Sequence, residues 1–395
     1  MKLTKNDFFG YMLMLVIFIF SPFYVFASGM PQPAHIIMLI ASVAIIFINH
    51  KYCVSILKAN KSLIAFLAVV FSVNFFYFFE YKKIIFIIKS MYWLYGFIMF
   101  LSVLCVFDNK WLGSWIKKFI ILQLCFISIS YLVGWGGYAF WPRYDYFFNG
   151  PSQLGYFSLS SFIIYLALSR GKLTIDFLAV YFLTGFSILM TGSRSCLLAF
   201  IPLILLLVYF EKGNYKKQLI LISVPIFIYI FFYFLRLPWH NPNQEISYLL
   251  KQGDDVGTFA FSRLAELCSQ CSTSETYSIE HQMQARGFFR VLDFPQYLLF
   301  GAGQGMDERF CNFNEIAYEI HSSILGVLFY YGLPGLAFFL SAVYKAFKNK
   351  INILLLSPLF VYGLFTFGLR SPYFFLTLGF VALIPNFFDS NAKYR

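Results

Sequence analysis

Twelve apolar stretches, each close to the length of a membrane-spanning helix, constrain this chain more than any other feature of its sequence. A spanning helix uses about 20 apolar residues, and stretches of about 17 can still cross. None of the stretches alternates between apolar and polar residues as a half-buried β-strand does. The sequence therefore predicts an all-α polytopic membrane protein with about 12 transmembrane helices. The stretches are 8–27, 34–49, 62–79, 84–107, 115–134, 152–169, 174–191, 195–210, 216–235, 320–344, 351–368 and 372–388.

The composition agrees with a membrane protein and excludes the other broad classes. Of the 395 residues, 60% are hydrophobic and 12% are charged. A soluble domain has roughly 45–50% apolar and about 25% charged residues. This chain has too little charge to keep a large surface in water, and it has no pattern of disorder, collagen or coiled coil. The first stretch is longer than the apolar region of a signal peptide, so we expect a retained first helix.

The basic residues lie unevenly on the two sides of the predicted bundle. Lysine and arginine concentrate on the cytoplasmic side of membrane proteins. If the stretches cross in turn, 18 basic residues fall on the side of the two termini, and five fall in the short loops of the other side, namely Lys82, Lys83, Arg143, Arg194 and Arg370. Both termini are therefore predicted to be cytoplasmic.

Residues 236–320 form the one long polar segment between two predicted transmembrane regions, 1–235 and 321–395. The segment carries eleven acidic and six basic residues, a net charge of −5, whereas the whole chain carries +12. Since its charge is opposite to that of a nucleic-acid patch, no nucleic-acid partner is expected. The parity of the stretches places it outside the cytoplasm. We expect one large periplasmic loop with a few short helices that cover the membrane region.

The seven cysteines fall into two groups. Cys53, Cys105, Cys125 and Cys196 lie in or beside apolar stretches, where a thiol is a small apolar filler. Cys268, Cys271 and Cys311 lie in the large loop, where an oxidising compartment permits a disulfide. A structural bridge is favoured over a redox or zinc role. Cys311 paired with Cys268 or Cys271, and a bridge within Cys268-Ser-Gln-Cys271, remain alternative pairings.

No histidine or carboxylate has the spacing of a metal site, so neither a metal nor a cofactor is predicted. Arginine is then the natural group for a phosphate, because its planar fork matches phosphate oxygens. Arg194, in Thr191-Gly192-Ser193-Arg194-Ser195, lies in a polar turn at a predicted helix start, which also favours an anion. A snorkelling side chain is the simpler interpretation.

Further polar residues flank the stretches on the same side. Ser152 and Gln153, after Gly150-Pro151, are ordinary helix-start residues that could also bind a sugar or phosphate. His321 begins the stretch that follows the loop, and an imidazole takes a proton from a hydroxyl at neutral pH. Arg286 and Arg290 are spaced one helical turn apart and are expected to share a face.

Two glycine-containing runs follow. Gly301-Ala302-Gly303-Gln304-Gly305 is expected to be a flexible turn rather than a dinucleotide site, because no strand precedes it. Gly332-Leu333-Pro334-Gly335 predicts a kink or a re-entrant break in a helix.

In their order along the chain, these motifs resemble those of the superfamily of O-antigen polymerases and O-antigen ligases of the bacterial inner membrane. The resemblance covers about residues 150–345. It rests on Gly150-Pro151-Ser152-Gln153-Leu154-Gly155, Thr191-Gly192-Ser193-Arg194-Ser195, the large loop with Arg286 and Gly301-Ala302-Gly303, and Glu319-Ile320-His321-Ser322-Ser323 followed by Tyr331-Gly332-Leu333-Pro334-Gly335.

The resemblance implies metal-independent transfer of a glycan from an undecaprenyl-diphosphate-linked donor at the periplasmic face. Arg194 and Arg286 would then hold the diphosphate, with Arg290 as a further contact, and His321 would orient or deprotonate the acceptor hydroxyl. Membrane lipid, a flippase and a chain-length regulator are implied as partners. Ligases more often have Asn after this histidine, and this chain has Ser322. A polymerase is therefore favoured over a ligase that transfers the glycan to the lipid A core.

A transporter, such as a flippase for lipid-linked oligosaccharides, is the alternative from a different class. Transport of a charged headgroup requires ionisable residues at the membrane midplane. Only Lys89 lies clearly inside a predicted span, so the enzyme is favoured.

Overall fold

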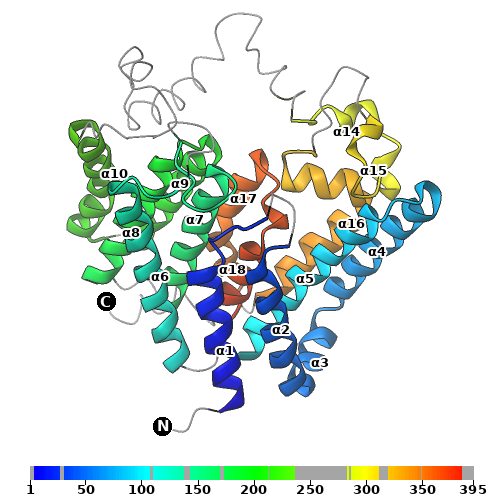
Figure 1. Ribbon diagram of the computed structural model, residues 1–395, viewed down its shortest axis with the longest axis horizontal. Helices are drawn as coiled ribbons and strands as arrows, with labels where there is room; N and C mark the ends of the chain where they lie inside the picture. The colour runs from blue at the N-terminus through cyan, green and yellow to red at the C-terminus, as the bar shows by residue number, and fades with distance from the viewer. Residues whose placement is uncertain are drawn as a thin grey trace, which may run out of the picture.

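The computed structural model of the chain describes residues 4–26, 31–106, 110–137, 143–169, 173–211, 213–235, 283, 286–310, 319–347 and 349–384. In these ranges the regular elements are all helices, and a single isolated β-bridge joins Gly137 to Tyr146. The predicted all-α class is confirmed for this part of the chain (Figure 1).

Every one of the twelve apolar stretches contains a helix. Before the polar segment these are α1 (Lys5–Leu15), which continues into the π-helix η1 (Val16–Phe20), α2 (Pro33–Ile48), α4 (Lys61–Tyr81), α5 (Ile85–Val106), α6 (Lys110–Leu132), α7 (Pro151–Ser169), α8 (Ile175–Thr191), α9 (Arg194–Phe210) and α10 (Tyr215–Leu235). After it come α16 (Ser323–Ala346), the 3-10 helix η4 (Lys350–Leu356) that leads into α17 (Ser357–Phe365), η5 (Gly368–Arg370) and α18 (Pro372–Ala382).

Fewer of these helices meet the length and hydropathy of a membrane span than the sequence predicted. Among the described residues, α4, α5, α6 and α16 are long and apolar enough to cross a bilayer, and α2 with the bent continuation α3 (His50–Ala59) would add a fifth span. Others are too short by this criterion, with 17 residues in α8 and in α9 and 11 in α18. The fold is thus an all-helical one with four or five candidate membrane spans.

Helix α3 (His50–Ala59) was not predicted. It follows α2 after a bend of 92° and lies at the end of the bundle where the N-terminus is found (Figure 1). The helix has a buried side and an exposed side, since Cys53 is buried whereas Lys51 and Lys58 are exposed. A ten-residue helix of this kind has no long apolar run, which is why counting apolar stretches missed it.

Helix α7 lies inside the bundle. Fifteen of its 19 residues are buried, and it packs against α8, α9, α17, α18 and α6. One of its serines bonds within the helix, since Ser158 Oγ donates to the Leu154 carbonyl at 3.0 Å. A Cβ at Gly155 would collide with Cys196 of α9, so glycine permits the close approach of these two helices. Enclosure by protein explains why a helix rich in serine is found in an apolar chain.

Helix α16 is broken at Gly332, as the sequence predicted. Gly332 has a φ of +69° and a ψ of −178°, which no helix contains. Because Pro334 has no N–H group, the Tyr330 carbonyl loses its usual donor four residues on. The N–H groups of Ala302 and Gly303 replace the missing donors, at 2.9 Å from the Phe329 and Tyr330 carbonyls respectively. A part of the chain distant in sequence thus supplies the hydrogen-bond donors that the break removes.

The segment that supplies these donors is a buried turn, and the expectation of a flexible turn at 301–305 is wrong. It lies between α15 (Tyr297–Phe300) and η3 (Asp307–Phe310), close to α14 (Arg290–Asp293). Arg309 holds it, because its guanidinium donates to the Ala302, Gly303 and Gly305 carbonyls at 2.8–3.2 Å. The same guanidinium lies over a set of aromatic rings, those of Tyr77, Tyr81, Phe86 and Phe310, at 4.7–5.1 Å.

We predict that Gly301→Ala destabilises the protein more than Gly134→Ala. Both glycines have a positive φ, of +86° and +71°, so both variants strain the backbone. A Cβ at Gly301 would also lie 2.5 Å from the Tyr330 carbonyl oxygen, whereas nothing lies within 4 Å of a Cβ at Gly134. We expect a loss of about 3 kcal/mol or more at Gly301 and about 1–2 kcal/mol at Gly134. Thermal unfolding in detergent measures the difference, and equal midpoints would contradict the close approach.

Candidate functional site

Three helix N-termini meet at one end of the bundle, the end that carries α14 and α15 (Figure 1). The starts of α7 and α9 are linked by the hydroxyls of Ser152 and Ser193, 3.2 Å apart. The start of α9 is linked to the end of α17 by the hydroxyls of Ser195 and Thr366, also 3.2 Å apart. The start of α16 joins them, because Ser323 Oγ donates to the Thr366 carbonyl at 3.1 Å.

These helix starts create an environment that favours an anion. The first N–H groups of a helix have no partner within it, and the helix dipole places partial positive charge there. Ser193 precedes α9 without capping it through its side chain, whereas Ser322 caps α16 by accepting from the Leu325 N–H. Three such starts lie together here, and Arg194 begins one of them, although the C-terminal ends of α8 and α17 at the same junction carry partial negative charge.

Arg286 lies beside this cluster. Its Nη1 donates to the Phe365 carbonyl at 3.0 Å, so the guanidinium reaches the last turn of α17, next to Thr366. The side chain is half-buried, and burial lowers the pKa of the guanidinium from its ordinary value. Arginine stays protonated even so. No salt bridge to Arg286 is found among the described residues.

His321 is fixed directly to Arg286. The His321 N–H donates to the Arg286 carbonyl at 3.0 Å. The imidazole Nδ1 lies 2.8 Å from the Glu319 carbonyl oxygen, which can only accept, so Nδ1 carries the proton in the neutral ring. The Nε2 atom of that tautomer is then a hydrogen-bond acceptor. A half-buried imidazole in this state is suited to remove a proton from a hydroxyl.

Arg194 is the first residue of α9 and is half-buried. Arg143, which the sequence placed in a short outer loop and assigned no ligand, approaches the same turn, because its Nε donates to the Thr191 carbonyl at 3.1 Å. The Tyr144 N–H donates to the Met190 carbonyl at 3.0 Å and holds this segment along the end of α8. The only indication of Arg143 in the sequence was its predicted position on the outer side of the membrane, where basic residues are few.

Ser152 and Gln153 occupy the first turn of α7, as predicted. Both side chains are half-buried. The Ser152 hydroxyl lies at the junction with α9, and its carbonyl accepts from the Tyr362 hydroxyl at 3.2 Å. Ser152 therefore belongs to the contacts that hold the helix starts together, in addition to any ligand that it binds.

Arg290 is placed differently from Arg286, and the expectation that they share a helix face is wrong. Gly287, with a φ of +69°, separates them, and α14 begins only at Arg290. Arg290 is 6% exposed, and its Nη1 forms an ion pair of 3.1 Å with Asp307 Oδ1. Tyr330 donates to the same oxygen at 2.6 Å and accepts from the Ile320 N–H at 3.1 Å. Arg290 thus supports the backbone that leads into His321.

The Asp307 carboxylate is held in a buried setting. Burial raises the pKa of Asp307 above its ordinary value, whereas the hydrogen bond from Tyr330 and the charge of Arg290 lower it. Removing one partner of a buried pair leaves the other charge without compensation.

Sequence reasoning missed a second polar cluster, which is centred on Gln304. Its Nε2 donates to Glu319 Oε1 at 2.5 Å, and its Oε1 accepts from Trp93 Nε1 and the Tyr331 hydroxyl at 3.0 and 2.7 Å. Lys89 Nζ lies 3.9 Å from the same Glu319 oxygen. This carboxylate therefore ties the loop to α5. The one signal in the sequence was Lys89, a charge inside an apolar stretch.

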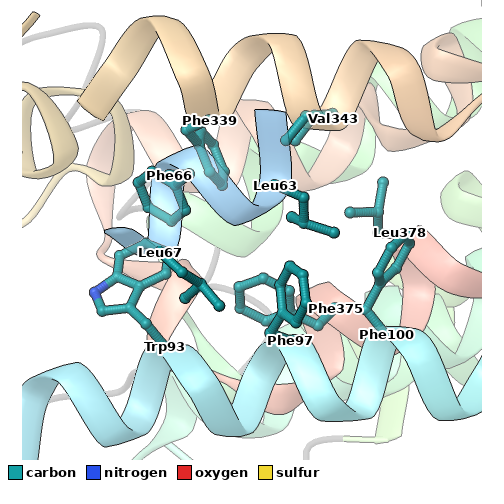
Figure 2. A pocket seen from close by; sticks show the side chains of 11 residues that line it. Leu63, Phe66, Leu67, Trp93, Phe97, Phe100, Phe339, Val343, Phe375 and Leu378 are labelled. Atoms are coloured by element: carbon teal, nitrogen blue, oxygen red, sulfur yellow. The ribbon is translucent and has the colours of Figure 1, made fainter. Parts of the chain in front are cut away.

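An apolar cavity lies between α4, α5, α16 and α18 (Figure 2). Its lining includes Phe66, Phe97 and Phe375, and its one polar atom, the indole nitrogen of Trp93, is already bonded to Gln304. It offers nothing to bind a sugar or a phosphate, and it is separate from the cluster of helix starts.

The absence of a metal and the disulfide of the loop cysteines stay predictions. No group of three or more metal-ligating side chains occurs among the described residues. Cys268, Cys271 and Cys311 lie outside the described residues, as does most of the predicted loop from 236 to 320.

Comparison of the sequence with protein-family models finds no match, and comparison with curated proteins finds none either.

We predict that Asp307→Ala destabilises the protein by about 3–5 kcal/mol, because it leaves Arg290 buried without its carboxylate. Asp307→Asn keeps an oxygen that accepts from Tyr330 and Arg290 and is the matched control, with a smaller loss. Thermal unfolding in detergent gives both values. Wild-type stability of both variants would show that the carboxylate charge does not support Arg290.

Proposed function

We propose that the chain is an O-antigen polymerase, a glycosyltransferase that joins undecaprenyl-diphosphate-linked repeat units at the periplasmic face of the bacterial inner membrane. The observation that carries the proposal is the direct backbone link between Arg286 and His321 beside the helix starts that surround Arg194. The backbone positions of a cation and a base are thereby held next to each other. The order of motifs that resembles the polymerase and ligase superfamily supports the same conclusion.

In the proposed reaction, a hydroxyl of the acceptor sugar attacks the anomeric carbon of the donor glycan. A new C–O bond forms, the bond between that carbon and the diphosphate breaks, and undecaprenyl diphosphate leaves with the bonding electrons. The hydroxyl proton passes to Nε2 of His321. Arg194 and Arg286 face the diphosphate and stabilise the negative charge that it gains, assisted by the N-termini of α7, α9 and α16.

The other predicted residues have supporting roles in this proposal. Ser152 and Gln153 contribute hydroxyl and amide groups at the start of α7. Arg290 acts through Asp307 and Tyr330 on the position of His321, and no contact with the diphosphate is assigned to it. Lys89, the one charge clearly inside a predicted span, is paired with Glu319 at the end of the loop and so has a structural explanation.

We predict that His321→Ala or Arg286→Ala leaves the protein inserted and shortens the surface polysaccharide to single-repeat glycolipid. Loss of the base costs about 10²–10⁴-fold in rate, and loss of a charge-stabilising donor costs about 10²–10³-fold. Electrophoresis of glycolipid from cells that express each variant gives the distribution of chain lengths. Arg286→Lys keeps the charge without the planar fork and should give an intermediate distribution.

The control is His50→Ala, which removes a largely exposed histidine on α3 at the other end of the bundle and should leave chain length unchanged. Long lipid-linked polymer without transfer to lipid A would identify a ligase instead. A normal chain-length distribution in the His321 and Arg286 variants, with the proteins inserted, would refute both enzymes and favour a transporter.

The proposed topology places both termini in the cytoplasm and residues 236–320 in the periplasm. It rests on the 18 basic residues of one side against five of the short loops on the other. We predict that alkaline phosphatase fused at residue 270 is active and that green fluorescent protein fused there is dark. The opposite pair of readings, with matching expression, would reverse the orientation and remove the diphosphate site from the periplasm.

A further inference from the structure

Two thiols lie against each other at the end of the bundle opposite the candidate site. The Sγ atoms of Cys53, on α3, and Cys105, in the last turns of α5, are 2.7 Å apart, and no disulfide joins them. A covalent S–S bond measures about 2.05 Å. Non-bonded carbon atoms pack at roughly 3.5–4.0 Å, and sulfur is larger than carbon. The two backbones therefore hold these side chains within bridging distance.

The pair lies at a junction that the surrounding contacts hold in place. Asn49, between α2 and α3, donates through its side chain to the Ile45 carbonyl and to Asn6 Oδ1, at 2.8 and 2.9 Å. The Asn49 carbonyl then accepts from the Cys53 N–H at 3.0 Å. The bend of 92° that brings α3 across the bundle is thus fixed on both sides of Asn49, directly before Cys53.

The two thiols differ in exposure. Cys53 is 3% exposed, whereas Cys105 is half-buried. An oxidant that arrives from outside the bundle therefore meets Cys105 first, and Cys53 is positioned as the second thiol.

We propose that Cys53 and Cys105 form a reversible disulfide that ties α3 to the end of α5. The Cys105 thiolate attacks a low-molecular-weight disulfide, a new S–S bond forms, and one small thiolate leaves. The Cys53 thiolate then attacks Cys105 Sγ of this mixed disulfide and displaces the second small thiol. The pair loses two electrons and two protons, and the small disulfide is reduced to two thiols. A reducing thiol reverses both steps.

The other described cysteines show that this arrangement is particular to the pair. Cys196 is fully buried, and its Sγ contacts the Ser152 carbonyl at 3.8 Å. Cys125 is half-buried on α6, and no sulfur contact to it is found among the described residues. These two fit the role of apolar filler that the sequence suggested, whereas Cys53 and Cys105 do not.

The test oxidises the full-length protein in detergent with oxidised glutathione, quenches with acid and alkylates the remaining thiols after denaturation. Trypsin cleavage after Lys51, Lys58, Lys89 and Lys110 yields peptides 52–58 and 90–110, one with each cysteine. We expect mass spectrometry to find most of peptide 52–58 linked to peptide 90–110, and dithiothreitol to release it. In the Cys53→Ser variant, the reaction should end at a glutathione adduct on Cys105, because the second thiol is missing.

Cys125 is the matched control within the same molecule, since it should gain at most a glutathione adduct. The proposal is overturned if peptides 52–58 and 90–110 both remain alkylated in the wild type at an oxidant level that modifies Cys125. It is also overturned if the two peptides are found only in links to other cysteines. Neither result depends on glycan transfer, because the readout is the peptide link.

Discussion

The break in α16 at Gly332 is the constraint on which the rest of this architecture depends. Inside a bilayer or a packed helical bundle, a carbonyl without a donor costs several kcal/mol. The break and Pro334 release the Phe329 and Tyr330 carbonyls, and the N–H groups of Ala302 and Gly303 satisfy them. The end of the polar segment is therefore a structural part of the helical bundle and cannot move away from α16 without exposing these groups.

This docking also determines where the candidate site lies. Once the turn at 301–305 is held by Arg309, the chain between it and α16 is short, and the polar clusters around Gln304 and Asp307 fix both of its ends. His321 lies two residues before α16, and its N–H donates to the Arg286 carbonyl. The positions of His321 and Arg286 therefore depend on the carbonyls that the break in α16 leaves without donors.

Local sequence predicted the elements well and their mutual contacts less well. Apolar length located a helix in each stretch, and Gly332 with Pro334 located the kink, because both signals are local. The spacing of Arg286 and Arg290 suggested one helix face, but a positive φ at Gly287 lies between them. The glycine turn suggested flexibility because its partners, such as Arg309 and the carbonyls of α16, are only brought to it by the fold. Helix α3 was not predicted because Cys53 is its one buried residue, which gives no apolar stretch in the sequence.

Two acidic residues of the loop are paired with other side chains, which limits the negative charge that they contribute around Arg286. Of its described acids, Asp307 is committed to Arg290 and Glu319 to Lys89 and Gln304. Arg309 is enclosed by aromatic rings and carbonyl oxygens. Arg286, in contrast, is bonded to the neutral carbonyl of Phe365, so its field is not cancelled by a paired carboxylate among the described residues. In a half-buried setting that field acts over a longer range than in water, and the dipoles of three helix starts add to it. In the proposed reaction, Arg286 can thus act on a diphosphate although the loop is net negative, because two of the acids near it in the sequence, Asp307 and Glu319, are held by other partners.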